Sequence, residues 1–127
     1  MQRQLETFYG TILACAGFGV WAVFSLLPAI AGYGIREGWD TPLYWVVGLP
    51  LLLVLHGIVG AVTDGLAWRF PLWTIGGHSL AMVLIGRSGV DLGLLPIALV
   101  LVGLPMYAVL YITTLTGRII ARLVKST

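Results

Sequence analysis

Charged residues divide this chain into long apolar segments. Every Asp, Glu, Lys and Arg lies near an end of the chain or in one of three short breaks. The apolar segments cover about residues 8–33, 43–63, 71–85 and 92–116. Because about 20 consecutive apolar residues in a helix cross a bilayer, this pattern predicts an all-α integral membrane protein with four transmembrane helices.

Composition indicates the same class. Hydrophobic residues make up 59% of the chain and charged residues 9%, and the mean hydropathy is +1.00, far from the values of soluble domains. Four spans use most of the 127 residues, so we expect a single transmembrane domain, residues 1–127, without a soluble domain or a nucleic-acid partner. The third segment has only about 15 apolar residues and needs flanking residues or a thinned bilayer to cross.

Basic residues are distributed unevenly between the two sides that this topology creates. One side carries five and the other two: Arg3, Arg69, Arg118, Arg122 and Lys125 against Arg36 and Arg87. Since cytoplasmic loops of membrane proteins are enriched in Lys and Arg, both termini are predicted to be cytoplasmic. The localisation that fits this pattern best is a multi-pass protein of a bacterial cytoplasmic (inner) membrane.

Residues 117–127 are predicted to form a short amphipathic basic tail. Arg118, Arg122 and Lys125 share one face of a helix, and aliphatic side chains share the other. Such a tail is expected to lie in the membrane interface and to bind anionic lipid headgroups. Aromatic residues mark both boundaries of the predicted spans, with Tyr33, Trp39, Tyr44 and Trp45 on the outer side and Phe8, Tyr9, Trp68, Phe70 and Trp73 on the inner side.

Small residues recur at helical spacing within the segments. The chain has 17 glycines, and no internal repeat is evident among them. The predicted helix-packing positions are Gly10, Ala14 and Gly17 in the first segment and Gly57, Gly60 and Ala61 in the second. Small residues allow backbones to approach closely in a membrane, either within one chain or against a larger membrane protein or a second copy.

The two histidines are the residues with the clearest chemical potential. His56 and His78 lie near the middle of the second and third segments, eight residues before Asp64 and nine after Arg69. At about 1.5 Å per residue both imidazoles are roughly 12 to 14 Å from this polar break, on antiparallel helices. The sequence therefore predicts that the two rings lie at the same depth, and it leaves open whether they face each other.

Three interpretations of this pair stay open. In the first, each histidine is neutral and hydrogen-bonds a neighbouring helix, for example through Thr74, Ser79 or a carbonyl left free near Pro50. In the second, His56 and His78 are the axial ligands of a b-type haem, with Arg69 near a propionate. In the third, the pair conducts protons toward Asp64, as part of a small proton or solute transporter or channel.

The pattern as a whole favours a non-enzymatic protein. The sequence has no residue set that indicates a catalytic centre or a metal site, and no phosphate-binding loop. Minimal loops, small-residue faces and a basic tail are typical of a small multi-pass accessory, anchor or scaffolding subunit in a larger membrane assembly. The haem-carrying electron-transfer subunit and the transporter are the alternatives.

Overall fold

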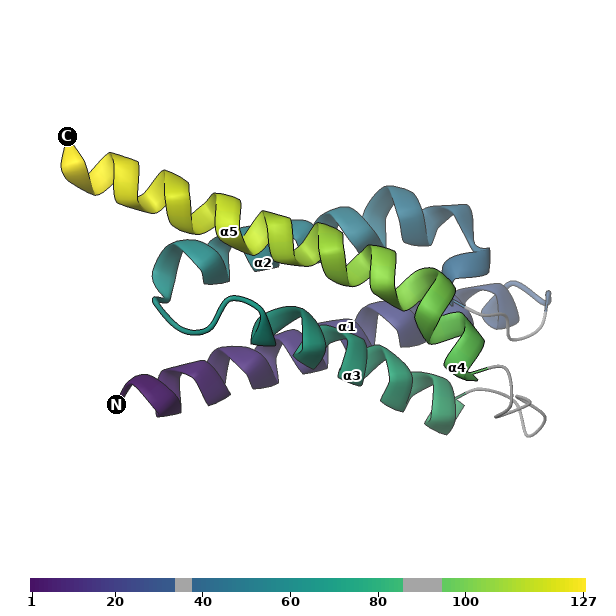
Figure 1. The fold of residues 1–127 in the computed structure, drawn as a ribbon. Helices are drawn as coiled ribbons and strands as arrows, with labels where there is room; N and C mark the ends of the chain where they lie inside the picture. Colours follow the sequence, from purple (N-terminus) through teal and green to yellow (C-terminus); the bar gives the residue numbers. More distant parts are fainter. Residues whose placement is uncertain (34–37, 86–94) are drawn as a thin grey trace.

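The computed structural model describes residues 1–33, 38–85 and 95–127 (Figure 1). Within these ranges all regular secondary structure is helical, and no strand occurs. Four rods can be followed, and a short 3-10 helix, η1 (Gly38–Asp40), precedes the second. The rods are α1 (Gln2–Ile30), η2 with α2 (Tyr44–Gly48 and Leu49–Val62), α3 (Arg69–Ile85), and α4 with η3 and α5 (Leu95–Ala98, Leu99–Gly103 and Leu104–Ser126).

Three of these rods are long and apolar enough to cross a membrane. They are Arg3–Ile30, Tyr44–Val62 and Pro96–Ser126. The helix α3 has 17 residues, which corresponds to about 25 Å and is shorter than a hydrocarbon core of about 30 Å. The prediction of an all-helical membrane protein is thus confirmed at the level of three candidate spans.

The helix ends differ from the predicted segments at both ends of the chain. The helix α1 begins at Gln2 instead of near residue 8, and the chain leaves it before Gly32, whose φ of 85° suits glycine. The helix α5 continues through the predicted tail to Ser126 without a break (Figure 1). The predicted start of the fourth segment at residue 92, and both Arg36 and Arg87, lie outside the described residues.

The rods associate in two parallel pairs. The helices α1 and α3 run in one direction and pack against each other, and α2 and α5 run together in the opposite direction (Figure 1). Contacts between the pairs are much sparser than contacts within them. Both termini lie at the same end of the bundle (Figure 1).

Glycines let the backbones of α2 and α5 touch. A Cβ on Gly60 would overlap the carbonyl group of Thr114, and a Cβ on Gly117 would overlap the carbonyl group of Gly57. Any larger residue at Gly60 or Gly117 would push the helices apart. Close approach of this kind favours Cα–H···O contacts and van der Waals packing, which replace the hydrophobic effect as the driving force between helices in lipid.

The pair of α1 and α3 is built in the same way. A Cβ on Gly17 would overlap the carbonyl oxygen of Thr74, and a Cβ on Gly77 would overlap that of Ala14. At the end near the termini, the indole ring of Trp73 lies against Gly10. Of the six predicted packing positions, Gly10, Gly17 and Gly60 are buried, and Ala14, Gly57 and Ala61 are partly exposed.

Two rods contain a π-helical segment that ends just before a proline. The segment η2 precedes Pro50 and η3 precedes Pro105. Each segment ends with the Val and Gly of the same tetrapeptide, Val-Gly-Leu-Pro. In each, the amide before the proline reaches the carbonyl five residues back, from Leu49 to Tyr44 and from Leu104 to Leu99. Since proline has no N–H to donate, a wider turn at this position is a local way to continue the helix. The expectation that the chain has no internal repeat is therefore wrong for this tetrapeptide.

A pair of glycine substitutions on α2 tests the packing at the crossing with α5. We expect Gly60→Ala to lower the free energy of unfolding by about 1–3 kcal/mol, because its Cβ would meet the backbone of Thr114. Gly57→Ala is the matched control, since the nearest atom to its Cβ is the Thr113 methyl at 3.8 Å. Reversible unfolding by SDS in mixed micelles measures both. Equal stability of the two variants would contradict the proposed crossing.

Candidate functional site

His56 is fully buried and joins three rods. Its Nδ1 lies 3.0 Å from Oγ1 of Thr114 on α5, and its Nε2 lies 2.8 Å from Oγ1 of Thr74 on α3. These hydrogen bonds link α2 to its own partner α5 and to the opposite pair. The imidazole is therefore a cross-link between the two glycine-packed pairs.

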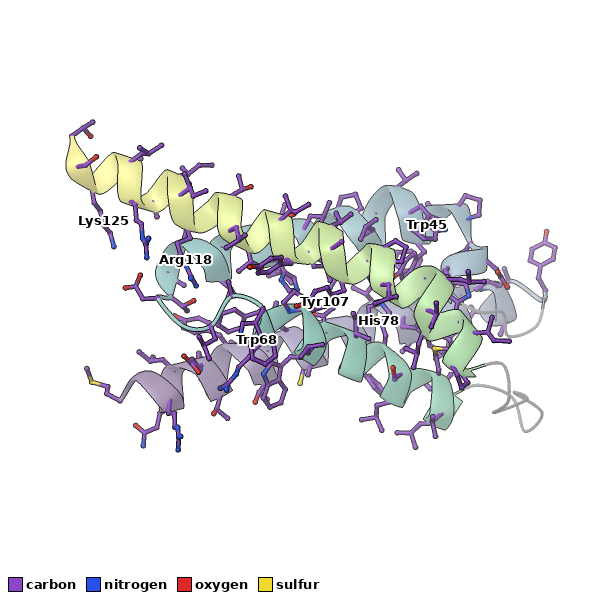
Figure 2. All side chains as sticks on the ribbon, in the orientation of Figure 1. Trp45, Trp68, His78, Tyr107, Arg118 and Lys125 are labelled. Atoms are coloured by element: carbon purple, nitrogen blue, oxygen red, sulfur yellow. The ribbon has the colours of Figure 1, made fainter. Side chains whose placement is uncertain are left out.

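His78 makes a second link between the pairs. Its Nε2 lies 2.7 Å from the hydroxyl of Tyr44 in η2, and its Nδ1 lies 3.0 Å from the backbone carbonyl oxygen of Thr74. Both His78 and Tyr44 are buried, and their rings meet edge to face with centroids 5.9 Å apart. Figure 2 shows His78 inside the bundle.

The partners of His78 determine where its proton is. A carbonyl oxygen can only accept, so Nδ1 of His78 donates to Thr74. In the neutral ring Nε2 is then an acceptor, and the hydroxyl of Tyr44 donates to it. The sulfur of Met106 lies 3.8 Å from the same hydroxyl, which has only one proton to give. The shorter contact to His78 takes that proton.

The partners of His56 determine its tautomer in the same way. The hydroxyl of Thr114 lies 2.8 Å from the carbonyl oxygen of Leu110 and donates to it, as threonine commonly does within a helix. Its oxygen is therefore the acceptor for the N–H at Nδ1 of His56. Nε2 of His56 then accepts from the hydroxyl of Thr74. Every nitrogen of both rings has a partner of the correct kind.

Thr74 is the residue that the two histidines share. Its hydroxyl serves His56 and its carbonyl serves His78, so each imidazole is hydrogen-bonded to Thr74 and not to the other ring. The sequence left open whether the two rings face each other. The structure places them on either side of one threonine, which hydrogen-bonds to both.

This arrangement does not fit the axial ligation of a haem. An iron ligand needs a ring nitrogen with a free lone pair, and the acceptor Nε2 of each histidine is already used, by Thr74 or by Tyr44. Ligation at both rings would break both of these hydrogen bonds. The network therefore offers no preformed position for the iron.

The direct hydrogen bonds of the network do not form a proton path from one ring to the other. The carbonyl oxygen of Thr74 interrupts the chain between the rings, because it accepts a hydrogen bond but has no proton to pass on. Asp64, the predicted proton acceptor, has a side chain that is 81% exposed and pairs with Arg122 at 3.7 Å. Within the described parts of the chain, no group of three His, Cys, Asp or Glu side chains is placed to hold a metal ion.

The basic residues of the predicted tail lie at the end of the bundle that carries the termini. Nη2 of Arg118 donates to the carbonyl oxygen of Gly65 at 2.6 Å, and Arg122 pairs with Asp64. Two of the three tail residues thus contact the connection between α2 and α3, while Lys125 is exposed (Figure 2). The tail is an extension of α5 that packs on this connection through Arg118.

Two members of the network, Tyr44 and Thr114, are not predicted from the sequence. Tyr44 is predicted to lie in an outer interfacial belt, but its side chain is fully buried and bonded to His78. Two positions 12 residues apart lie about 120° apart around a regular helix, so a regular helix would not place Tyr44 and His56 on one face. The π-helical turn absorbs one residue and reduces this angle to about 20°. Nothing in the sequence indicates a role for Thr114 beyond the fact that it is a polar residue in an apolar segment.

Comparison of the chain with family models, curated proteins and solved structures finds no match. The chemistry of the site therefore rests on the geometry of the network itself.

Removal of one hydroxyl tests the network. We expect Thr74→Val, which keeps the shape of the side chain, to lower the free energy of unfolding by about 1–3 kcal/mol, because Nε2 of His56 loses its donor. Thr116→Val is the control, since its hydroxyl is exposed and bonds only within its own helix. Unfolding in SDS-containing mixed micelles measures both. If Thr74→Val is no more destabilising than Thr116→Val, the hydrogen bond to His56 is not a structural link.

Proposed function

We propose that this chain is a small non-catalytic membrane subunit that anchors or scaffolds a larger membrane protein assembly. The observation that carries the proposal is the closed histidine network, in which every ring nitrogen is committed to a hydrogen bond that joins helices. Polar groups inside a membrane protein are expensive and usually functional. In this chain the polar side chains of the network join the two helix pairs by hydrogen bonds.

The outer surface of the long C-terminal rod supports a role in assembly. Pro96–Ser126 is the least covered of the three candidate spans, with 22% of its apolar window buried, against 39% for Arg3–Ile30 and 28% for Tyr44–Val62. Its exposed side includes Leu101, Leu104 and Ile112, each about two thirds exposed. We assign this side of α5 and η3 as the surface for a helix of the larger partner.

The proposal includes four transmembrane helices with both termini in the cytoplasm of a bacterium, and α3 as the short fourth span. The termini lie at one end, together with all the basic side chains that the structure describes: Arg3, Arg69, Arg118, Arg122 and Lys125 (Figures 1 and 2). Trp45 and Trp68 lie toward opposite ends, which suits two interfacial belts (Figure 2). An excess of positive charge at one end favours the cytoplasmic side for that end.

Reporter fusions test the orientation. Green fluorescent protein fused after Thr127 is expected to fluoresce in bacterial cells, and alkaline phosphatase fused there to be inactive, because this end is cytoplasmic. Fusions after Asp40, at the opposite end, are the control and are expected to show the reverse pattern. An active phosphatase after Thr127 would overturn the proposed topology.

Site-directed photo-cross-linking tests the assembly role. A photoreactive residue in place of Ile112 is expected to cross-link one larger membrane protein in native membranes, because this side chain points outward. Leu110, two positions away and fully buried, is the matched control and is expected to cross-link only within the chain. The cross-linked species should co-purify with the untreated chain at fixed stoichiometry in mild detergent. Adducts only to lipid, or only to a second copy, would contradict a larger partner.

A further inference from the structure

The outer face of α1 and α3 carries two adjoining hollows that differ in character. The larger is an apolar groove of about 740 Å³ along the span, and the smaller, of about 230 Å³, lies at the end near the termini. Arg69 and Trp73 line both of them. The two hollows therefore form one continuous surface with a charged end and an apolar length.

The larger hollow exists because small residues from both helices lie side by side. Ala14 and Cys15 of α1 and Gly76 and Gly77 of α3 line it, together with Trp68. A Cβ on Gly76 would meet nothing within 4 Å, so this glycine is not needed for packing inside the bundle. The volume lies within the range of small-molecule sites, about 300–1,000 Å³.

The smaller hollow is basic. Arg3 and Arg69 line it together with one acid, Glu6. The pair between Arg69 and Glu6 spans 3.7 Å and the Arg69 side chain is 47% exposed, so water screens this contact and it holds the guanidinium only weakly. The guanidinium of Arg69 also lies 5.3 Å from the ring centre of Trp68, where the polar and apolar hollows join.

We propose that these two hollows together bind one phospholipid with an anionic headgroup. The headgroup phosphate takes hydrogen bonds from Arg69 and Arg3, and an acyl chain follows the groove past Gly76 and Cys15. Arginine is well suited to phosphate because its planar fork can give two parallel hydrogen bonds. Charge selects this occupant over a partner helix, since Arg3 and Arg69 share only one acid, Glu6, and an apolar helix would bring no further anion to them.

This site is separate from the basic tail of α5 and goes beyond the assembly role. Arg118 donates to the carbonyl oxygen of Gly65, on the connection between α2 and α3, and Arg122 makes an exposed pair with Asp64 on the same connection. Arg3 and Arg69 belong to α1 and α3 and line a hollow that no tail residue lines. The lipid would occupy the α1 and α3 face, whereas the partner helix is assigned to α5.

Native mass spectrometry of the full chain in mixed micelles tests the proposal, with phosphatidylglycerol and phosphatidylcholine as probes. The wild type is expected to retain one phosphatidylglycerol at a several-fold higher fraction than phosphatidylcholine. Gly76→Leu fills the groove and should lose this bound lipid. Gly19→Leu is the matched control, because a Cβ there also meets nothing within 4 Å and Gly19 does not line the groove.

The charged end is tested separately. Arg69→Gln is expected to abolish the preference for phosphatidylglycerol, while Arg122→Gln leaves it unchanged. Equal retention of the two lipids by the wild type would overturn the proposal. Equal retention of phosphatidylglycerol by Gly76→Leu and Gly19→Leu would also overturn it. A preference that survives Arg69→Gln and disappears in Arg122→Gln would overturn it as well, because the site would then lie at the tail. None of these results depends on the cross-linking from Ile112.

Discussion

The architecture depends on the need to satisfy polar groups inside an apolar bundle. The hydrocarbon interior supplies no water to hydrogen-bond an imidazole nitrogen, so each buried histidine needs a donor and an acceptor within the protein. His56 finds them in Thr74 and Thr114, and His78 finds them in Tyr44 and the carbonyl of Thr74. Because these partners lie on different rods, meeting the requirement also joins the two helix pairs.

Within each pair the forces are of a different kind. Lipid tails are as apolar as leucine, so burial of apolar surface does little to hold helices together in a membrane. Close backbone contact holds the helices together instead. In one pair Gly60 lies against Thr114, and in the other Gly17 lies against Thr74 and Gly77 against Ala14. Thr74 and Thr114 belong to both systems, since their backbones meet the glycines and their hydroxyls meet His56. Packing and hydrogen bonding are thus coupled at the same residues.

The division of surfaces follows from this interior. The side chains of the histidine network bond to each other inside the bundle. The exterior is largely apolar, with a hollow on α1 and α3 and a long uncovered side on α5. Charged side chains among the described residues gather mostly at the end with the termini. An exterior of this kind suits interaction with lipid and with other helices better than it suits chemistry on a soluble substrate.

The sequence by itself determined the class of the protein, the approximate helices and the two histidines as the central polar residues. Hydropathy and charge spacing carry that information directly, because apolar length and the positions of charges depend on the local sequence. Only the tertiary structure decided which surfaces face inward, since lipid-facing and core-facing positions are equally apolar. It also decided the partners of His56 and His78, because the π-helical turn before Pro50 rotates Tyr44 onto the inner face, away from the position that a regular helix predicts.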